Sequence, residues 1–396
     1  MNKTDYSVPG FKASSATAGL KKNKAPDMAL IFSEKEATAA GVFTKNKVKA
    51  APVLLSMEHL KNGKARAIIA NAGNANACTG SKGMENARLT AGMAAEALGI
   101  KPEEILVAST GIIGAQLDMD KVSRTIPNLA EGLSSDGVLR VAEAIMTTDS
   151  FSKISRFDGR AQDIPYRIIG IAKGAGMIMP DMATMLCFIL TDIKMEPSEL
   201  KRAILSSAEK TFNRITVDGD TSTNDTLLIL ANGMAGNGPL NADDYQAFNR
   251  GLQHVMNELC FMIVKDGEGA TKVVRVKVKG AFTGDDAITA ARTVANSNLV
   301  KTAFYGQDVN WGRIMAALGR SGISMKEEEV AIWVDDVIIV EYGLSTGTEQ
   351  EKKAAQKMKN REFSLIIDLQ QGEHEDHVIT CDLTHEYISI NADYRT

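Results

Sequence analysis

Residues 173–186 read Lys-Gly-Ala-Gly-Met-Ile-Met-Pro-Asp-Met-Ala-Thr-Met-Leu, and the apolar run 185–190 follows directly. A glycine-rich loop with a proline that leads into such a run predicts a chain entering a buried strand. The loop ends on Thr184, so a hydroxyl is expected at the mouth of that strand. This segment therefore indicates both a central strand of an α/β fold and a candidate nucleophile.

The hydroxyl of Thr184 needs activation, because a neutral threonine hydroxyl is a weak nucleophile. If the bond between Ala183 and Thr184 breaks, Thr184 becomes a chain N-terminus. Its own α-amine can then act as general base, and an α-amino pKa of about 7.7–8.0 suits that task near neutral pH. The alternative is that Thr184 is an ordinary β-branched residue at the start of a strand.

Taken alone, the glycines of this segment fit either a ligand-binding loop or an ordinary turn. Lys173 precedes Gly174 and Gly176, so the segment lacks the spacing of a phosphate-binding P-loop. A Gly-x-Gly without a third glycine is also weak support for a dinucleotide site. An ordinary turn remains the simpler interpretation of the glycines taken alone.

Other stretches strengthen the functional interpretation. In chain order they are Asn71-Ala-Gly-Asn-Ala-Asn-Ala-Cys-Thr-Gly80, Ser109-Thr-Gly-Ile-Ile-Gly114, Thr147-Thr-Asp149, Asp218-Gly-Asp-Thr-Ser-Thr-Asn-Asp225, Asp266-Gly-Glu-Gly-Ala-Thr271, Asp308-Val-Asn-Trp-Gly-Arg313 and Asn391-Ala-Asp-Tyr-Arg-Thr396. Together with residues 173–186, this set spans nearly the whole chain. It resembles the glutamate N-acetyltransferases, also called ornithine acetyltransferases, of arginine biosynthesis.

The resemblance implies a self-cleaving enzyme with an N-terminal threonine. The bond between Ala183 and Thr184 would break autocatalytically, and Thr184 would then carry an acetyl group from N2-acetylornithine to glutamate. The matching positions make Thr110 and Gly111 the oxyanion hole. They make Thr147, Lys173, Thr184, Glu268, Asn391 and Thr396 the substrate-binding residues.

Each of these residues also has an ordinary structural interpretation. Thr110 and Gly111 follow an apolar run and fit a strand-to-loop turn, and Lys173 fits a surface lysine. Glu268 lies in a loop between two glycines, and residues 391–396 fit a frayed terminus. In the functional interpretation, the Lys173 ammonium binds a carboxylate and Glu268 accepts from the ornithine ammonium.

Composition limits the function classes. The chain has 396 residues, of which 44% are hydrophobic and 24% charged, with a net charge of −4. This is ordinary globular composition without a basic stripe, so nucleic-acid binding is not expected. The four cysteines form no C-x-x-C pair, which argues against a zinc site or a disulfide framework. The sequence shows no signal peptide and no membrane span, so we expect a cytoplasmic protein.

Short apolar runs alternate with amphipathic stretches, without a strict strand–helix–strand rhythm. Expected strands are 28–32, 67–71, 105–109, 166–172, 185–190, 273–278, 330–333, 337–340 and 363–367, and expected helices are 82–98, 137–146, 197–212, 242–264, 285–296 and 348–358. The pattern predicts an α/β (α+β) fold with mixed sheets. The resemblance implies layered sheets between helices, as in N-terminal-nucleophile enzymes. We expect a main catalytic domain over 1–282 and a smaller α/β domain over 283–396 that closes the site.

Two clusters of metal-type ligands are better explained without a metal. His374-Glu-Asp-His377 lies between two expected strands and fits a solvated hairpin tip. Residues 218–225 carry many oxygens but lack the spacing of a calcium-binding loop, and they fit internal hydrogen bonds near the site. No metal or resident cofactor is therefore expected, although acetyl-CoA as a co-substrate is left open.

Two rival functions stay open at this point. The first is an N-terminal-threonine aminopeptidase or amidase, in which water takes the acyl group. The second is an uncleaved, non-catalytic ligand-binding protein. The expected partners are small-molecule substrates, without nucleic acid or membrane, and the resemblance implies a tetramer with two copies of each fragment.

Overall fold

The computed structural model describes residues 5–179 and 185–393, and the chain divides into two compact units. The first unit comprises residues 1–213 and 220–263, with residue 396, and the second comprises 214–219 and 264–395. The expected boundary after residue 282 therefore falls inside the second unit. The physical reason is that the strand Val273–Ala281 pairs on both sides with later strands, so it cannot belong to the first unit's sheet.

The first unit contains an eight-stranded mixed sheet. Its strands are β1 Phe11–Ala16, β2 Met28–Phe43, β3 Lys64–Asn74, β4 Ile105–Ile112, β5 Lys153–Ala161, β6 Ile164–Lys173, β7 Leu186–Thr191 and β8 Thr226–Ala231. The order is β4-β3-β2-β8-β7-β6-β5, with β1 paired to β2. A register shift between Phe32 and Ala37 divides the long β2, whose first half pairs with β1 and β3 and whose second half pairs with β8.

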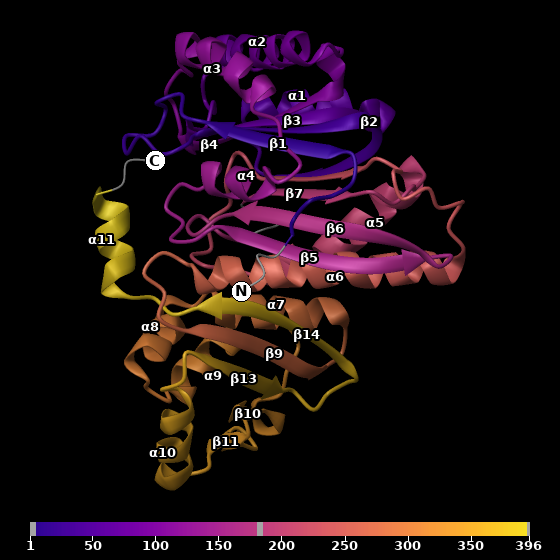
Figure 1. Cartoon of the computed structure of the whole chain (residues 1–396). Coiled ribbons are helices and arrows are strands. Elements are labelled where there is room, and N and C mark those ends of the chain that lie inside the picture. Colours follow the sequence, from indigo (N-terminus) through magenta and orange to yellow (C-terminus); the bar gives the residue numbers. More distant parts are fainter. Residues whose placement is uncertain (1–4, 180–184, 394–396) are drawn as a thin grey trace. The chain divides into compact units, whose positions relative to one another are not determined.

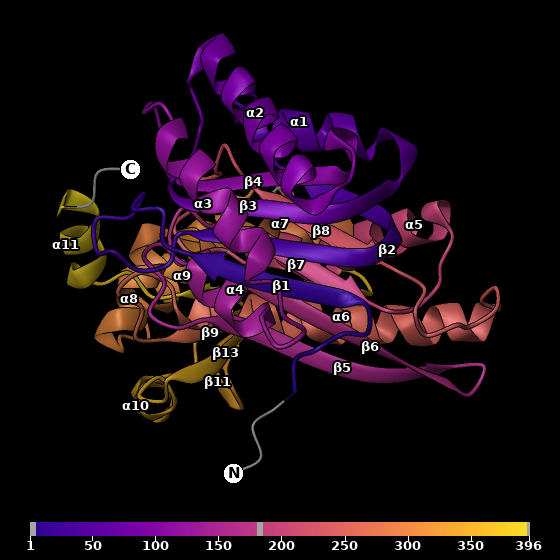
Figure 2. The ribbon, with the colours of Figure 1, turned by 45° about the horizontal axis from the view of Figure 1, so that its top comes forward.

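Helices cover the outer sides of both halves of this sheet (Figure 1). They are α1 Ala51–His59, α2 Gly80–Leu98, α3 Met119–Glu131, α5 Pro197–Lys210 and α6 Ala242–Lys265, whereas α4 Val138–Ala144 belongs to the apolar cluster between the two halves. Helices α1, α2 and α3 group over β3 and β4 (Figure 2), where they share an apolar cluster with Leu30 and Ile69. A second cluster joins the two halves of the sheet, with Ile31 and Leu106 from one half and Ile171 and Phe188 from the other. The predicted arrangement of layered mixed sheets between helices is confirmed.

The second unit has its own six-stranded mixed sheet, in the order β12-β11-β10-β13-β9-β14. Its elements are β9 Val273–Ala281, α7 Gly284–Ala295, α8 Asn298–Gly306, α9 Trp311–Gly319, β10 Ala331–Val334, β11 Val337–Glu341, β12 Leu344–Ser345, α10 Thr348–Lys357, β13 Glu362–Asp368, β14 His374–Cys381 and α11 His385–Asp393. Short 3₁₀ helices at Leu60–Asn62, Pro102–Glu104, Phe212–Arg214 and Glu327–Glu329 complete the described elements. Apolar residues of β9, β10 and β13 pack against α7 and α9 in one core cluster.

The segment His374–His377 is not the expected hairpin tip. It begins strand β14 and pairs with β9, with a register shift between His374 and Asp376. Asp376 accepts from Arg214 Nε at 2.9 Å, and burial lowers the pKa of His377, with the charge of Arg275 acting in the same direction. This segment is therefore a strand that is held by backbone pairing with β9, and not the turn that its polar composition suggested.

Helix α6 approaches β6 closely because residue 170 is glycine. A Cβ atom built on Gly170 would lie 2.6 Å from Val255 Cγ1 and 2.8 Å from Leu259 Cδ1 of α6. In contrast, a Cβ on Gly92 of α2 would meet no atom within 4 Å.

We therefore predict opposite effects for two substitutions. Gly170→Val should lower the free energy of unfolding by about 1–3 kcal/mol, because the side chain must force α6 away from the sheet. Gly92→Ala should raise it by up to about 1 kcal/mol, because alanine favours the helix and has room there. Urea unfolding followed by circular dichroism measures both, and an unchanged stability of Gly170→Val would contradict the packing.

Candidate active site

Lys173 is the last residue of β6, and it lies opposite Leu186 of β7. The lysine is almost fully buried, with 7% of its surface exposed. Its ammonium donates to Thr147 Oγ1 at 2.7 Å and to Thr110 Oγ1 at 3.5 Å. Because an ammonium can only donate, each hydroxyl oxygen accepts from it and keeps its own hydrogen for another acceptor. The predicted residues Lys173, Thr147 and Thr110 are thus brought together.

Gly111 follows Thr110 in β4 and has φ of +131°. A Cβ atom at this position would lie 2.3 Å from the carbonyl carbon of Gly73 and 2.5 Å from the backbone nitrogen of Asn74. Both the backbone conformation and the close approach of β3 therefore require glycine here. The end of β4 presents a hydroxyl and closely packed backbone at one place.

Asparagines hold the end of β4 in position. Asn224 Nδ2 donates to Ser109 O at 2.8 Å and to Ala75 O at 2.6 Å. Ser109 Oγ donates to Asn71 Oδ1 at 2.6 Å. The expectation that residues 218–225 build internal hydrogen bonds is confirmed for Asn224. Asn71 was missed as a supporting residue, although the repeated Asn and Gly in 71–80 were a visible signal.

A buried carboxylate, Asp149, lies beside Lys173. Its Oδ2 is 3.8 Å from Lys173 Nζ, and its Oδ1 accepts from Lys153 Nζ at 2.8 Å. Burial alone would raise the pKa of Asp149, but the charges of Lys173 and Lys153 and several hydrogen bonds hold the pKa below its usual range. Asp149 is therefore ionised at neutral pH, and the charge of Lys173 has a near counterion.

The second unit brings together two other predicted residues. Asn391 Nδ2, on α11, donates to Glu268 Oε2 at 2.8 Å and to Tyr387 O at 3.0 Å. Glu268 is largely buried, with 9% of its surface exposed. An amide nitrogen that donates to this carboxylate limits the directions from which a ligand can approach it. Ala183, Thr184 and Thr396 lie outside the described residues.

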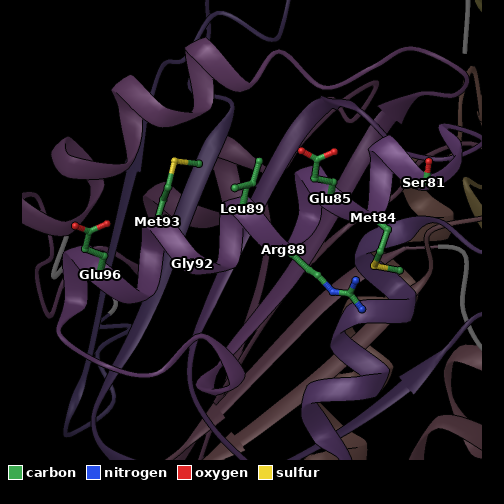
Figure 3. Close-up of a pocket in the computed structure, with 8 residues that line it drawn as sticks. All are labelled: Ser81, Met84, Glu85, Arg88, Leu89, Gly92, Met93 and Glu96. Carbon is green, nitrogen blue, oxygen red and sulfur yellow. The ribbon is translucent and has the colours of Figure 1, made fainter.

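An open groove lies elsewhere, along one face of α2 (Figure 3). It is lined by Ser81, Met84, Glu85, Arg88, Leu89, Gly92, Met93 and Glu96. None of the predicted site residues belongs to it. In the described residues, no group of three or more His, Cys, Asp or Glu side chains could hold a metal ion, and no helix is long and apolar enough to cross a membrane.

The side chains gathered around Lys173 indicate the kind of chemistry that this site supports. A buried ammonium, two hydroxyls that accept from it and a tightly packed strand end suit a site that stabilises negative charge on a reacting group. Such a site, at the ends of β4 and β6, suits an enzyme that transfers acyl groups.

Comparison with known proteins gives the family. The ArgJ family model matches residues 12–396. The arginine biosynthesis bifunctional protein ArgJ of Geobacter sulfurreducens is 49% identical over 98% of this chain and 100% of its own length. The glutamate N-acetyltransferase of Methanocaldococcus jannaschii is 47% identical, with 98% of this chain and 97% of the relative covered. The chain belongs to the ArgJ family.

A solved structure agrees with this assignment. The crystal structure of the arginine biosynthesis bifunctional protein ArgJ from Bacillus halodurans matches with a TM-score of 0.50 at 38% identity. The match covers 52% of this chain and 98% of that chain.

The close packing at Gly111 gives a direct prediction. Gly111→Ala should lower kcat by roughly 10²–10³, because the added Cβ must move the strand end that carries the predicted oxyanion donors. Steady-state acetyl transfer measures the effect. Gly114→Ala is the matched control, since Gly114 also has a positive φ, of +84°, but has open space around it. Equal activities of the two variants would remove Gly111 from the site.

Proposed function

We propose that this chain is a glutamate N-acetyltransferase that moves an acetyl group from N2-acetylornithine to glutamate through an acetyl ester of Thr184. The observation that carries the proposal is the Lys173 ammonium, which binds the hydroxyls of Thr110 and Thr147 in a buried site. The names of the two relatives, each about as long as this chain, support acetyl transfer in arginine biosynthesis.

The first chemical step forms the ester. The Thr184 hydroxyl attacks the acetyl carbonyl carbon while the Thr184 α-amine takes the hydroxyl proton. The oxyanion that develops accepts from Thr110 Oγ1 and from the Gly111 backbone N–H. Ornithine leaves when its nitrogen takes the proton back, and the acetyl group stays on the Thr184 oxygen. Lys173 supplies positive charge beside this centre and the point charge that binds a substrate carboxylate.

The second step repeats the first in reverse with another amine. The α-amine of glutamate attacks the ester carbonyl and gives a proton to the Thr184 α-amine, and the Thr184 oxygen leaves as it takes that proton. We assign Glu268 to the side-chain ammonium of ornithine and Asn391 and Thr396 to further substrate contacts. Glu268 suits an ammonium because its buried carboxylate can only accept.

The same oxygen performs the cleavage that creates the N-terminus. Attack of the Thr184 hydroxyl on the Ala183 carbonyl would give an ester, which water hydrolyses to two fragments. The solved Bacillus halodurans chain supports this step, because it matches over nearly its full length and yet corresponds to about half of this chain. We propose an assembly of two copies of each fragment, in the cytoplasm and without a resident cofactor.

The rival functions have less support. The names of the relatives do not favour an aminopeptidase, an amidase or a non-catalytic binding protein. Whether acetyl-CoA also serves as acetyl donor is decided by assay, since one relative is named bifunctional and another is named for a single activity.

The cleavage gives the prediction of this proposal. Purified protein should contain two fragments of about 20 and 23 kDa, as length scaling of 42.5 kDa gives, the second starting Thr-Met-Leu-Cys. Thr184→Ala should stay uncut and transfer no acetyl group, because both steps lose the same hydroxyl. Intact-mass spectrometry and an assay with acetylornithine and glutamate measure the two effects. An uncut wild-type chain with full transferase activity would contradict the mechanism.

A further inference from the structure

Asp149 lies beside Lys173, and none of its side chain is exposed. Its Oδ1 accepts from Lys153 Nζ at 2.8 Å and from the Gly174 backbone N–H at 2.6 Å. Its Oδ2 accepts from the Thr147 backbone N–H at 2.9 Å. One carboxylate thus binds the backbone of two predicted site segments.

Lys153 is the second buried charge in this group. Its side chain is also fully enclosed, and it begins β5 opposite Ala172, the residue before Lys173. Its ammonium lies 4.9 Å from the centre of the Phe151 ring. Two lysines from neighbouring strands therefore face a single carboxylate, and Asp149 is the counterion that allows both to stay charged away from water.

We infer that Asp149 is a positioning residue for the acetyl-transfer site, which keeps the Lys173 ammonium charged and directed at the Thr110 and Thr147 hydroxyls. This inference rests on the proposed function. Lys153 holds one carboxylate oxygen, so the other stays on the side of Lys173 and of the Thr147 backbone. The carboxylate also fixes Gly174, where the loop to the cleavage site begins.

Lys21 is a third lysine whose charge interacts with Asp149 and Lys173. Lys21 donates to Pro26 O and Ala144 O at 2.8 Å, and burial lowers its pKa to about 8. The charge of Lys173 lowers this pKa further, whereas Asp27 and Asp149 raise it. The cations that act here are therefore Lys21, Lys153 and Lys173, and the anions are Asp149 and Asp27. Asp27 accepts hydrogen bonds from the backbone N–H groups of residues 18, 20 and 21. Loss of the Asp149 charge leaves three lysines and only one carboxylate, Asp27, in this group.

The sign of the expected pH effect follows from this excess. An anion 3.8 Å from the Lys173 ammonium favours its protonated form, so removal of the anion makes Lys173 lose its proton at lower pH. The alkaline limb of the kcat/KM profile should then move to lower pH by about one unit or more. KM for acetylornithine should rise with pH over the same range, because the carboxylate of the substrate loses its cationic partner.

Two variants separate this role from simple stabilisation. Asp149→Asn keeps an oxygen that can accept from Gly174, but it leaves the Lys153 charge buried without its counterion. The double variant Asp149→Asn with Lys153→Met removes both charges of the buried pair, and such neutral replacements often restore stability. Thermal unfolding, kcat and KM from pH 6 to 10, and the extent of self-cleavage are measured for each.

The two variants should differ in stability but share the change in catalysis. The double variant should regain most of the melting temperature lost in Asp149→Asn, yet both variants should keep a shifted alkaline limb and a raised KM, with the smaller shift in the double variant because the repulsion from Lys153 is also gone. Ser14→Ala is the control for destabilisation alone, because buried Ser14 Oγ donates to Leu129 O at 2.6 Å in another part of the unit. It should lower the melting temperature without moving the pH profile.

A double variant with the wild-type pH profile and KM would overturn the inference and leave Asp149 as half of a structural ion pair. Failure of the proposed function looks different. In that case wild-type protein itself would transfer no acetyl group from acetylornithine to glutamate, whatever the variants do.

Discussion

The site depends on keeping a lysine charged inside the protein. Removal of an ammonium from water is costly, and the cost is offset here by Asp149 and by hydroxyl acceptors at the end of β4 and after α4. Because the pKa of Asp149 is held below its ordinary value, its stabilising contribution is present above that value and is lost as the pH falls towards the depressed one. Acid should therefore weaken the site and the fold around it together.

Close packing supplies the second constraint. Strand ends approach each other at Gly111 and Gly73, and helix α6 approaches β6 at Gly170, at distances that a Cβ atom would not permit. These contacts place Thr110 beside Lys173 with little freedom to move. The polar chemistry of the site thus depends on apolar packing and on glycines that carry no chemical group of their own.

Much of this arrangement was predictable from sequence. Apolar runs gave the central strands, and the motif around residues 109–114 placed Thr110 and Gly111 at a strand end, where the structure has them. Glu268 and Asn391 were identified only by resemblance, because no local pattern indicates that a terminal helix donates to that loop. The roles assigned to the site residues stay predictions.

The missed features share a physical cause. Asp149 and Lys153 follow the expected helix 137–146 in a stretch for which no strand was predicted, and their burial depends on β5 pairing with β6. Likewise His374–His377 has the composition of a turn, but pairing with β9 makes it a strand. Helix α3 contains Pro127, which local propensity places outside a helix. In each case tertiary contacts outweigh the local sequence.

The acetyl group itself gives the most direct test of the account. Wild-type protein is mixed with acetylornithine alone, the fragments are separated, and the peptide that begins at Thr184 is analysed by tandem mass spectrometry. The account predicts one acetyl group on the Thr184 oxygen, and its transfer to glutamate faster than to water when glutamate is added. Transfer to glutamate at the normal rate, with no acetylated Thr184 at any time, would contradict it.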